Sequence, residues 1–100
     1  MANQYLLNED LLTAIQKHER GIAEALISQG ADVNYATLRG NTPLTFAIQA
    51  NDIEMIKFLL KNGADAWKEV QTLTGGSINA INFARYVMHN EDLARFLEYS

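Results

Sequence analysis

Two histidines are the side chains of this sequence best suited to acid–base chemistry near neutral pH. His18 and His89 are the only histidines of the chain, and no cysteine accompanies them. No second histidine lies at the spacing of a zinc motif, and no nucleophile stands at a recognisable spacing from either ring. We therefore expect both histidines to be ordinary turn or capping residues, and we expect no catalytic residue, metal or cofactor.

Two aspartates and one glycine pair are further candidates for ligand-binding groups. Asp32 and Asp65 each follow a Gly-Ala pair. Because the same short segment recurs in the chain, a structural role is favoured, in which each carboxylate accepts hydrogen bonds within the turn after the glycine. The segment Gly75-Gly76-Ser77 lacks the lysine and the preceding strand of a phosphate-binding loop, so it predicts a flexible turn.

The composition narrows the classes of function. The 100 residues include 12 acidic and 8 basic side chains, which gives a formal net charge of −4, and 48% of the residues are hydrophobic. The basic residues are scattered, which argues against binding of nucleic acid. No apolar run approaches about 18 residues, the length needed to span a membrane, and the N-terminus lacks a secretory signal. We expect one cytoplasmic domain over residues 1–100.

An internal repeat organises the elements that must position these side chains. Alignment of residues 11–32 with residues 44–65 gives eight identities in 22 positions. A weaker third copy, which contains Ile81-Asn82-Phe83-Ala84, follows at an offset of 37, and its second half fits better at an offset of 38. The extra residues predict a longer connection near residues 67–77 and one added residue between the helices of the last copy.

Each copy has the apolar spacing of two short helices. Thr42 and Pro43 are typical of a helix start, Leu44 and Ile48 lie on one apolar face, and Gly63 is typical of a helix end. Pairs this short cannot bury their apolar stripes alone, so they must stack on one another. The expected helices span residues 9–17, 21–28, 43–50, 53–61, 80–88 and 91–98.

Polar residues near both ends of the repeat are typical of terminal units. Asn8-Glu9-Asp10 predicts a capped start of the first helix. Arg85 and Glu98 take positions that are apolar in the central copy, and polar side chains keep the outer face of a terminal unit hydrated. We expect three units, at about residues 8–34, 35–67 and 68–100, and a chain that is complete from one cap to the other.

Three segments carry a family resemblance. The segment Gly40–Ala47 (GNTPLTFA), followed by Ile56–Asp65 (IKFLLKNGAD), resembles an ankyrin repeat, and the first copy keeps Gly30–Asn34 (GADVN). The spacing of the first two copies also matches the family's period of about 33 residues. Departures from its pattern are Thr45 in place of histidine, Asn51 in place of glycine, and Asn79-Ala80-Ile81 in place of Thr-Pro-Leu. The resemblance covers about residues 8–98 and implies an all-α solenoid of three stacked helix-turn-helix units with extended turns between them.

The resemblance also implies that the protein binds another protein. Partners of ankyrin repeat proteins commonly contact the tips of the turns and the exposed, concave face of each first helix. The corresponding candidate residues here are Gln16, Lys17, Leu38, Arg39, Asn41, Gln49, Trp67, Val70, Leu73 and Tyr86.

Among these candidates, aromatic and arginine side chains dominate binding hot spots, so Trp67, Tyr86 and Arg39 are the leading anchors. Alternatives stay open for several of them. Trp67 could fill the gap left by the longer connection, Tyr86 could pack against Trp67 or the inserted loop, and Val70 and Leu73 could fold that loop back onto the stack.

The small size of the chain favours a dedicated inhibitor, antitoxin or immunity-type protein that is monomeric on its own. A net charge of −4 would speed its encounter with a basic partner. A self-associating structural module is the alternative function, and an enzyme is the least favoured.

Overall fold

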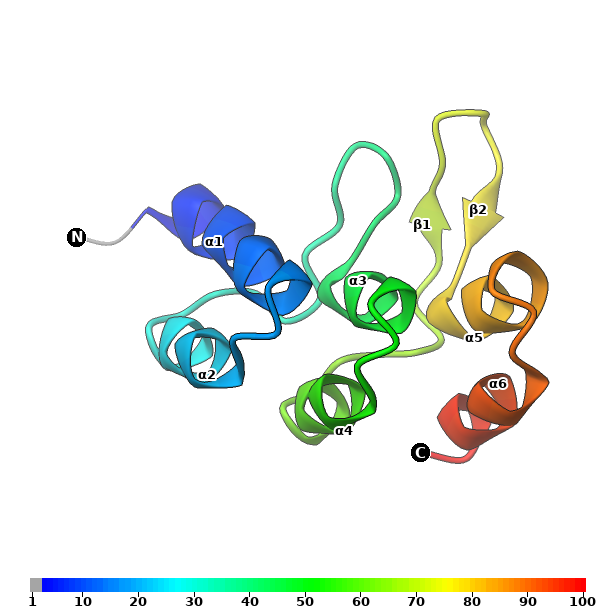
Figure 1. Ribbon diagram of the computed structural model, residues 1–100. Coiled ribbons are helices and arrows are strands. Elements are labelled where there is room, and N and C mark those ends of the chain that lie inside the picture. Colours follow the sequence, from blue (N-terminus) through cyan, green and yellow to red (C-terminus); the bar gives the residue numbers. More distant parts are fainter. Residues whose placement is uncertain (1–2) are drawn as a thin grey trace.

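The computed structural model of the chain describes residues 3–100. Within them the helices form three pairs, and Figure 1 shows α1, α3 and α5 in one row and α2, α4 and α6 in a second row. This arrangement confirms the predicted all-α stack of three helix-turn-helix units. The pairs are α1 (Gln4–Gln16) with α2 (Arg20–Ser28), α3 (Pro43–Gln49) with α4 (Ile53–Lys61), and α5 (Ala80–Asn82), continued by the π-helix η1 (Phe83–Val87), with α6 (Glu91–Glu98).

The core runs continuously through the stack. Helix α1 packs against α2 and α3, and α3 packs against α4 and η1. Repeated apolar positions line these contacts, including Leu11, Ile48, Ile56, Leu59 and Leu97, all of which are at most 1% exposed. Because each unit shares its buried stripe with the next, no unit depends only on its own two helices.

The central unit confirms the predicted start and end signals. The Thr42 hydroxyl accepts a hydrogen bond from the Thr45 N–H at 3.2 Å, and the Thr42 N–H donates to the Thr45 hydroxyl at 2.8 Å. Pro43 occupies the first helical position, where no backbone donor is needed. Gly63 has φ +98° after α4, as expected for a residue that ends a helix in the left-handed region.

The turn between the two helices of each unit is built the same way. His18, Asn51 and His89 occupy equivalent places there and have φ of +59°, +53° and +53°. A non-glycine residue is strained at such angles, although asparagine and histidine tolerate them better than most. The histidines therefore lie in turns, as predicted, and Asn51 adopts a backbone conformation that glycine would adopt without strain.

The predicted start of the first helix was wrong. Helix α1 begins at Gln4, and the Asn3 side chain caps it by accepting the Tyr5 N–H at 2.9 Å. Asn8 lies inside the helix, is 5% exposed, and its side-chain oxygen accepts the Asp32 N–H at 2.7 Å. The polar sequence around Asn8 resembles a cap, but its amide is needed for a contact with the distant turn.

The longer connection before the third unit forms a β-hairpin. Strands β1 (Val70–Gln71) and β2 (Ser77–Ile78) pair antiparallel, with Val70 opposite Ile78 and Gln71 opposite Ser77. Gly75, with φ +91°, and the Thr72 N–H, which donates to the Gly76 carbonyl at 2.8 Å, close the turn. The glycine pair thus belongs to an ordered hairpin turn.

The added residue of the third unit lies inside its first helix. The Met88 N–H donates to the Phe83 carbonyl, five residues back, at 3.0 Å, whereas the corresponding Ala50 N–H donates to Phe46, four residues back, at 3.0 Å. The π-helix η1 therefore absorbs one extra residue. This insertion explains why the third copy aligns with the second at an offset of 37 before η1 and at an offset of 38 after it.

Candidate protein-binding site

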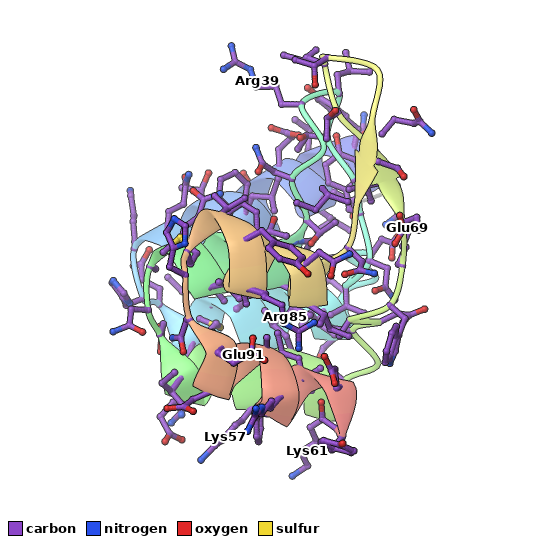
Figure 2. All side chains as sticks on the ribbon, turned by 90° about the vertical axis from the view of Figure 1, so that its right-hand side faces the viewer. Arg39, Lys57, Lys61, Glu69, Arg85 and Glu91 are labelled. Atoms are coloured by element: carbon purple, nitrogen blue, oxygen red, sulfur yellow. The ribbon has the colours of Figure 1, made fainter. Side chains whose placement is uncertain are left out.

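Two loops rise from the row of first helices and form one edge of the molecule (Figure 1). In the first loop, the Thr37 N–H donates to the Asn41 carbonyl at 2.8 Å and the Gly40 N–H donates to the Thr37 carbonyl at 3.0 Å. These bonds hold Leu38 and Arg39 at the tip. Leu38 is 94% exposed, and Figure 2 shows Arg39 pointing outward from the same end.

The first loop touches the β1–β2 hairpin through its backbone. A Cβ atom at Gly40 would lie 2.6 Å from the Gln71 carbonyl oxygen, closer than such atoms approach each other. Glycine is therefore required for this contact. It allows the two loops to lie against each other, so Leu38 and Leu73, which is 72% exposed near the hairpin turn, belong to one continuous edge.

The exposed side of the first helices adds polar and aromatic groups beside the loops. Gln16 and Gln49 are exposed, and the Gln49 amide donates to the half-buried Asn41 side chain at 3.4 Å. Tyr86, on η1, is 66% exposed. We refer to the tips of both loops and these helix residues together as the loop-side face.

Trp67 and Tyr86 are too exposed to be core residues. Trp67 follows the turn after α4, where its backbone N–H donates to the Asp65 carboxylate at 2.9 Å, and the residue is 57% exposed. A ring that filled a gap in the stack would be buried. Exposure keeps both aromatic residues available for contacts with another molecule.

Val70 does not belong to the candidate site. The residue is 6% exposed and pairs with Ile78 in the hairpin. Its prediction as a contact residue was wrong because the hairpin turns this side chain inward, which was the alternative for this loop. Lys17, which follows the end of α1, is exposed, whereas its equivalent in the second unit, Ala50, is half-buried.

Comparison with known proteins bears on what this face does. The family model for ankyrin repeats in three copies matches residues 4–70. The chain belongs to the ankyrin repeat family. The match ends before the third helical pair, whose π-helix and altered start depart from the family pattern. Ankyrin repeats generally mediate contacts between proteins and are typically not catalytic.

Three relatives of this ankyrin repeat protein come from fowlpox virus (strain NVSL). The ankyrin repeat protein FPV233 is 43% identical over 53 residues, which are 52% of this chain and 10% of that protein. FPV219 is 40% identical over 62 residues, 61% of this chain and 14% of that protein. FPV244 is 33% identical over 70 residues, 70% of this chain and 10% of that protein. The chain thus spans about a tenth of the length of these relatives.

The aspartates have the structural role predicted for them. Asp32 accepts the Asn34 N–H at 2.8 Å, and Asp65 accepts the Trp67 N–H at 2.9 Å. The His18 Nδ1 atom lies 2.9 Å from the Asp52 carboxylate, whose other oxygen caps α4 by accepting the Met55 N–H at 3.1 Å. These carboxylates are thus engaged by the turns and helix starts of the ankyrin repeat.

Residues 3–100 contain neither a metal-binding cluster nor a membrane-spanning helix. In this part of the ankyrin repeat protein, no group of three or more His, Cys, Asp or Glu side chains comes together to hold a metal ion. Nor is any helix in the same range both long and apolar enough to cross a membrane.

Sequence reasoning missed one polar contact beside the loop-side face. The Tyr35 hydroxyl donates to the Glu9 carboxylate at 2.9 Å. This hydrogen bond, with some burial, raises the pKa of Tyr35 above its ordinary value. No sequence signal could have found the pair, because Glu9 was expected in a helix start and lies instead within the longer α1.

A cluster of charges closes the α6 end of the stack. The Arg85 guanidinium pairs with Glu91 at 2.6 Å and with Glu98, and Figure 2 shows Arg85 and Glu91 near each other on this end. The hydrogen bond to Glu91 is the main reason why the pKa of Arg85 is raised. The same bond holds the pKa of Glu91 below its ordinary value. This surface is therefore polar where inner units are apolar.

Proposed function

We propose that this ankyrin repeat protein is a non-catalytic module that binds another protein through its loop-side face, as a dedicated inhibitor, antitoxin or immunity-type protein of the cytoplasm. The observation that carries the proposal is the exposure of Leu38 and Leu73, at 94% and 72%, on two loops whose backbones lie against each other. Large apolar side chains at loop ends gain free energy when another surface covers them.

The loop-side face is also built to bind at low entropic cost. The first loop packs closely on the Gln71 backbone at Gly40, and a packed loop needs less ordering when a partner arrives. Trp67, Tyr86 and Arg39 belong to the residue types that contribute most at interfaces. The packed loops and these anchor types together support recognition of a folded surface.

The charge of the protein supports a basic partner. Acidic side chains outnumber basic ones by 12 to 8. The resulting field raises the rate of encounter with a positively charged protein, and added salt would slow that encounter. The absence of cysteine fits a cytoplasmic site of action.

Affinity capture with matched variants tests the proposal. Immobilised wild-type protein is mixed with lysate of its source cells, and bound proteins are identified by mass spectrometry. We expect Leu38→Asp and Trp67→Ala each to lose the proteins that the wild type retains. Ile53→Asp, a change at a 40% exposed residue on the outer helix α4, should retain them.

All variants must keep the helical circular dichroism of the wild type, so that lost binding is not lost folding. Equal capture by wild type, Leu38→Asp and Trp67→Ala would refute the loop-side face as the binding site. A melting temperature that collapses in Trp67→Ala would show that Trp67 is a packing residue.

A further inference from the structure

The outer surface of the first unit is hollowed. A cavity of about 220 Å³ opens there between α1 and α2, at the end of the stack opposite the Arg85 cluster. Ile22 on α2 and Leu6 on α1 are 50% and 55% exposed. We name this surface the α1–α2 end face; the residues that line its cavity are Asp10, Thr13, Ala14, Glu19, Ile22 and Leu26.

The α1–α2 end face is the counterpart of a surface that is covered elsewhere in the stack. The repeat alignment pairs Ile22 with Met55 and Leu26 with Leu59, and these two partners are 1% and 0% exposed beneath the first unit. Ile22 is half exposed because no residue in the described range 3–100 is stacked on it. The end face is thus one half of a repeat-to-repeat interface without the other half.

In the first unit, side chains of α1 make the hydrogen bonds to the turn that follows α2. The Gln4 amide donates to the Gly30 carbonyl at 2.6 Å, and Asn8 accepts the Asp32 N–H. In the second unit, a single residue of the preceding connection, Asn34, makes both of the equivalent bonds. The first turns of α1 thus supply the contacts that a loop supplies before α3.

We propose that the partner is a second copy of this chain, bound end face to end face. The opposite end of the stack is closed by the Arg85, Glu91 and Glu98 ion pairs, so a head-to-tail chain of copies would bury charges against apolar groups. An end-face pair is isologous and closes on itself as a two-fold dimer.

One pair of charges and two apolar groups of the end face are self-complementary under this symmetry. Asp10 and Thr13 lie on one stripe of α1, and Lys17, the residue that caps the end of the helix, continues this stripe. When two such helices run antiparallel about Thr13, Asp10 of each copy lies opposite Lys17 of the other. The same axis brings Ile22 of one α2 opposite Leu26 of the other. The dimer leaves both loop-side faces free, and it does not depend on the proposed function.

Sedimentation equilibrium of the full chain, from low micromolar to near millimolar concentration, tests the proposal. We expect a monomer–dimer equilibrium for the wild type. Ile22→Glu should weaken the dimer at least about tenfold, whereas Ile53→Glu, a matched change on α4, should leave it intact. Circular dichroism checks that both variants remain folded.

A charge exchange gives an independent outcome. Lys17→Asp alone places acids opposite Asp10 and should weaken the dimer, and the double variant Asp10→Lys/Lys17→Asp should restore it. A wild type that stays monomeric at the highest concentration overturns the proposal. So does equal loss of the dimer in Ile22→Glu and Ile53→Glu, or a double variant as weak as Lys17→Asp alone.

Discussion

The Asn34 side chain joins its own turn to the turn that contains Asp65. Its oxygen accepts the Asp65 N–H at 2.8 Å, and its amide donates to the Gly63 carbonyl at 3.0 Å. These two backbone groups lie just past the end of α4, where helical partners have run out. One asparagine therefore fixes the spacing between neighbouring units on the loop side.

Removal of this link should lower the stability of the whole stack. We expect Asn34→Ala to reduce the free energy of unfolding by roughly 1–2 kcal/mol, because two backbone groups of a solvent-exposed turn lose their hydrogen-bond partner. Urea unfolding followed by circular dichroism measures the change. Gln29→Ala, at an exposed residue after α2, should be nearly neutral, and equal midpoints for the two variants would contradict the role of Asn34.

The contact between the two loops predicts different costs for two glycine substitutions. Gly40 and Gly75 have similar φ of +83° and +91°, but only a Cβ at Gly40 meets another backbone, the Gln71 carbonyl oxygen at 2.6 Å. Gly75→Ala should therefore lower the unfolding free energy only by the strain of a left-handed alanine, about 1–2 kcal/mol.

Gly40→Ala should cost about 1–3 kcal/mol more than that, because the two loops must separate. Denaturant unfolding of both variants compares the two values. If Gly40→Ala were no worse than Gly75→Ala, the loops would not be held together by this approach.

The Glu91 ion pair predicts a loss of stability in acid. Its pKa in the folded protein lies below the ordinary value of 4.5, so between the two values the unfolded chain binds more protons. The stabilisation by Glu91 is therefore complete above pH 4.5 and is lost as the pH falls through the lowered value. Arg85→Lys should reduce the same effect, since lysine cannot bridge both carboxylates with a planar fork.

Urea unfolding at a series of acidic pH values compares the wild type with Glu91→Gln. The variant should be less stable than the wild type near neutral pH, and the difference should shrink as the pH falls. Added salt should also shrink it, because Glu91 is half exposed and the pair is screened. A difference that does not vary with pH would rule out this ion pair as its cause.

The hydrogen bond from Tyr35 to Glu9 predicts an unusual tyrosine titration. The folded pKa of Tyr35 is raised above its ordinary value of 10.0, so the bond stabilises the protein fully below pH 10.0 and is lost as the pH rises through the raised value. Ultraviolet absorbance should show that one of the four tyrosines ionises late.

Two variants identify this late tyrosine. Tyr35→Phe should remove it from the titration, and Glu9→Gln should return its pKa toward the ordinary value, because the carboxylate that accepts the hydrogen bond is gone. Late ionisation that persists in Tyr35→Phe would assign it to another tyrosine.

The stacked fold could be predicted from the sequence because its signals are local or periodic. Thr42 with Pro43 starts a helix, and Gly63 ends one, through bonds within a few residues. The predicted start of α1 was wrong because Asn8 makes a tertiary contact with Asp32. A turn-forming residue type cannot show whether its partner is near or distant in sequence.

The candidate site was only partly accessible to sequence reasoning. Leu38 could be placed at a tip because the resemblance to ankyrin repeats assigns its segment to the turn between the first two units. The inward turn of Val70 depends on pairing with Ile78 in a two-residue strand, which is too short to show alternation. The exposure of Trp67 depends on the packing of neighbouring units, which a repeat alignment does not describe.

The π-helix η1 explains how the last unit accommodates one more residue than the central unit. The surplus residue bulges within one turn, so the carbonyl of Ala84 still receives the Asn90 N–H at 2.8 Å, as Ala47 receives that of Asp52 at 3.0 Å. The residues that follow η1 therefore return to the repeat positions expected for them along α6. An insertion here distorts the helix locally and leaves the packing of the helical pairs unchanged. Further changes in length could therefore be accommodated at this position without disrupting the stack.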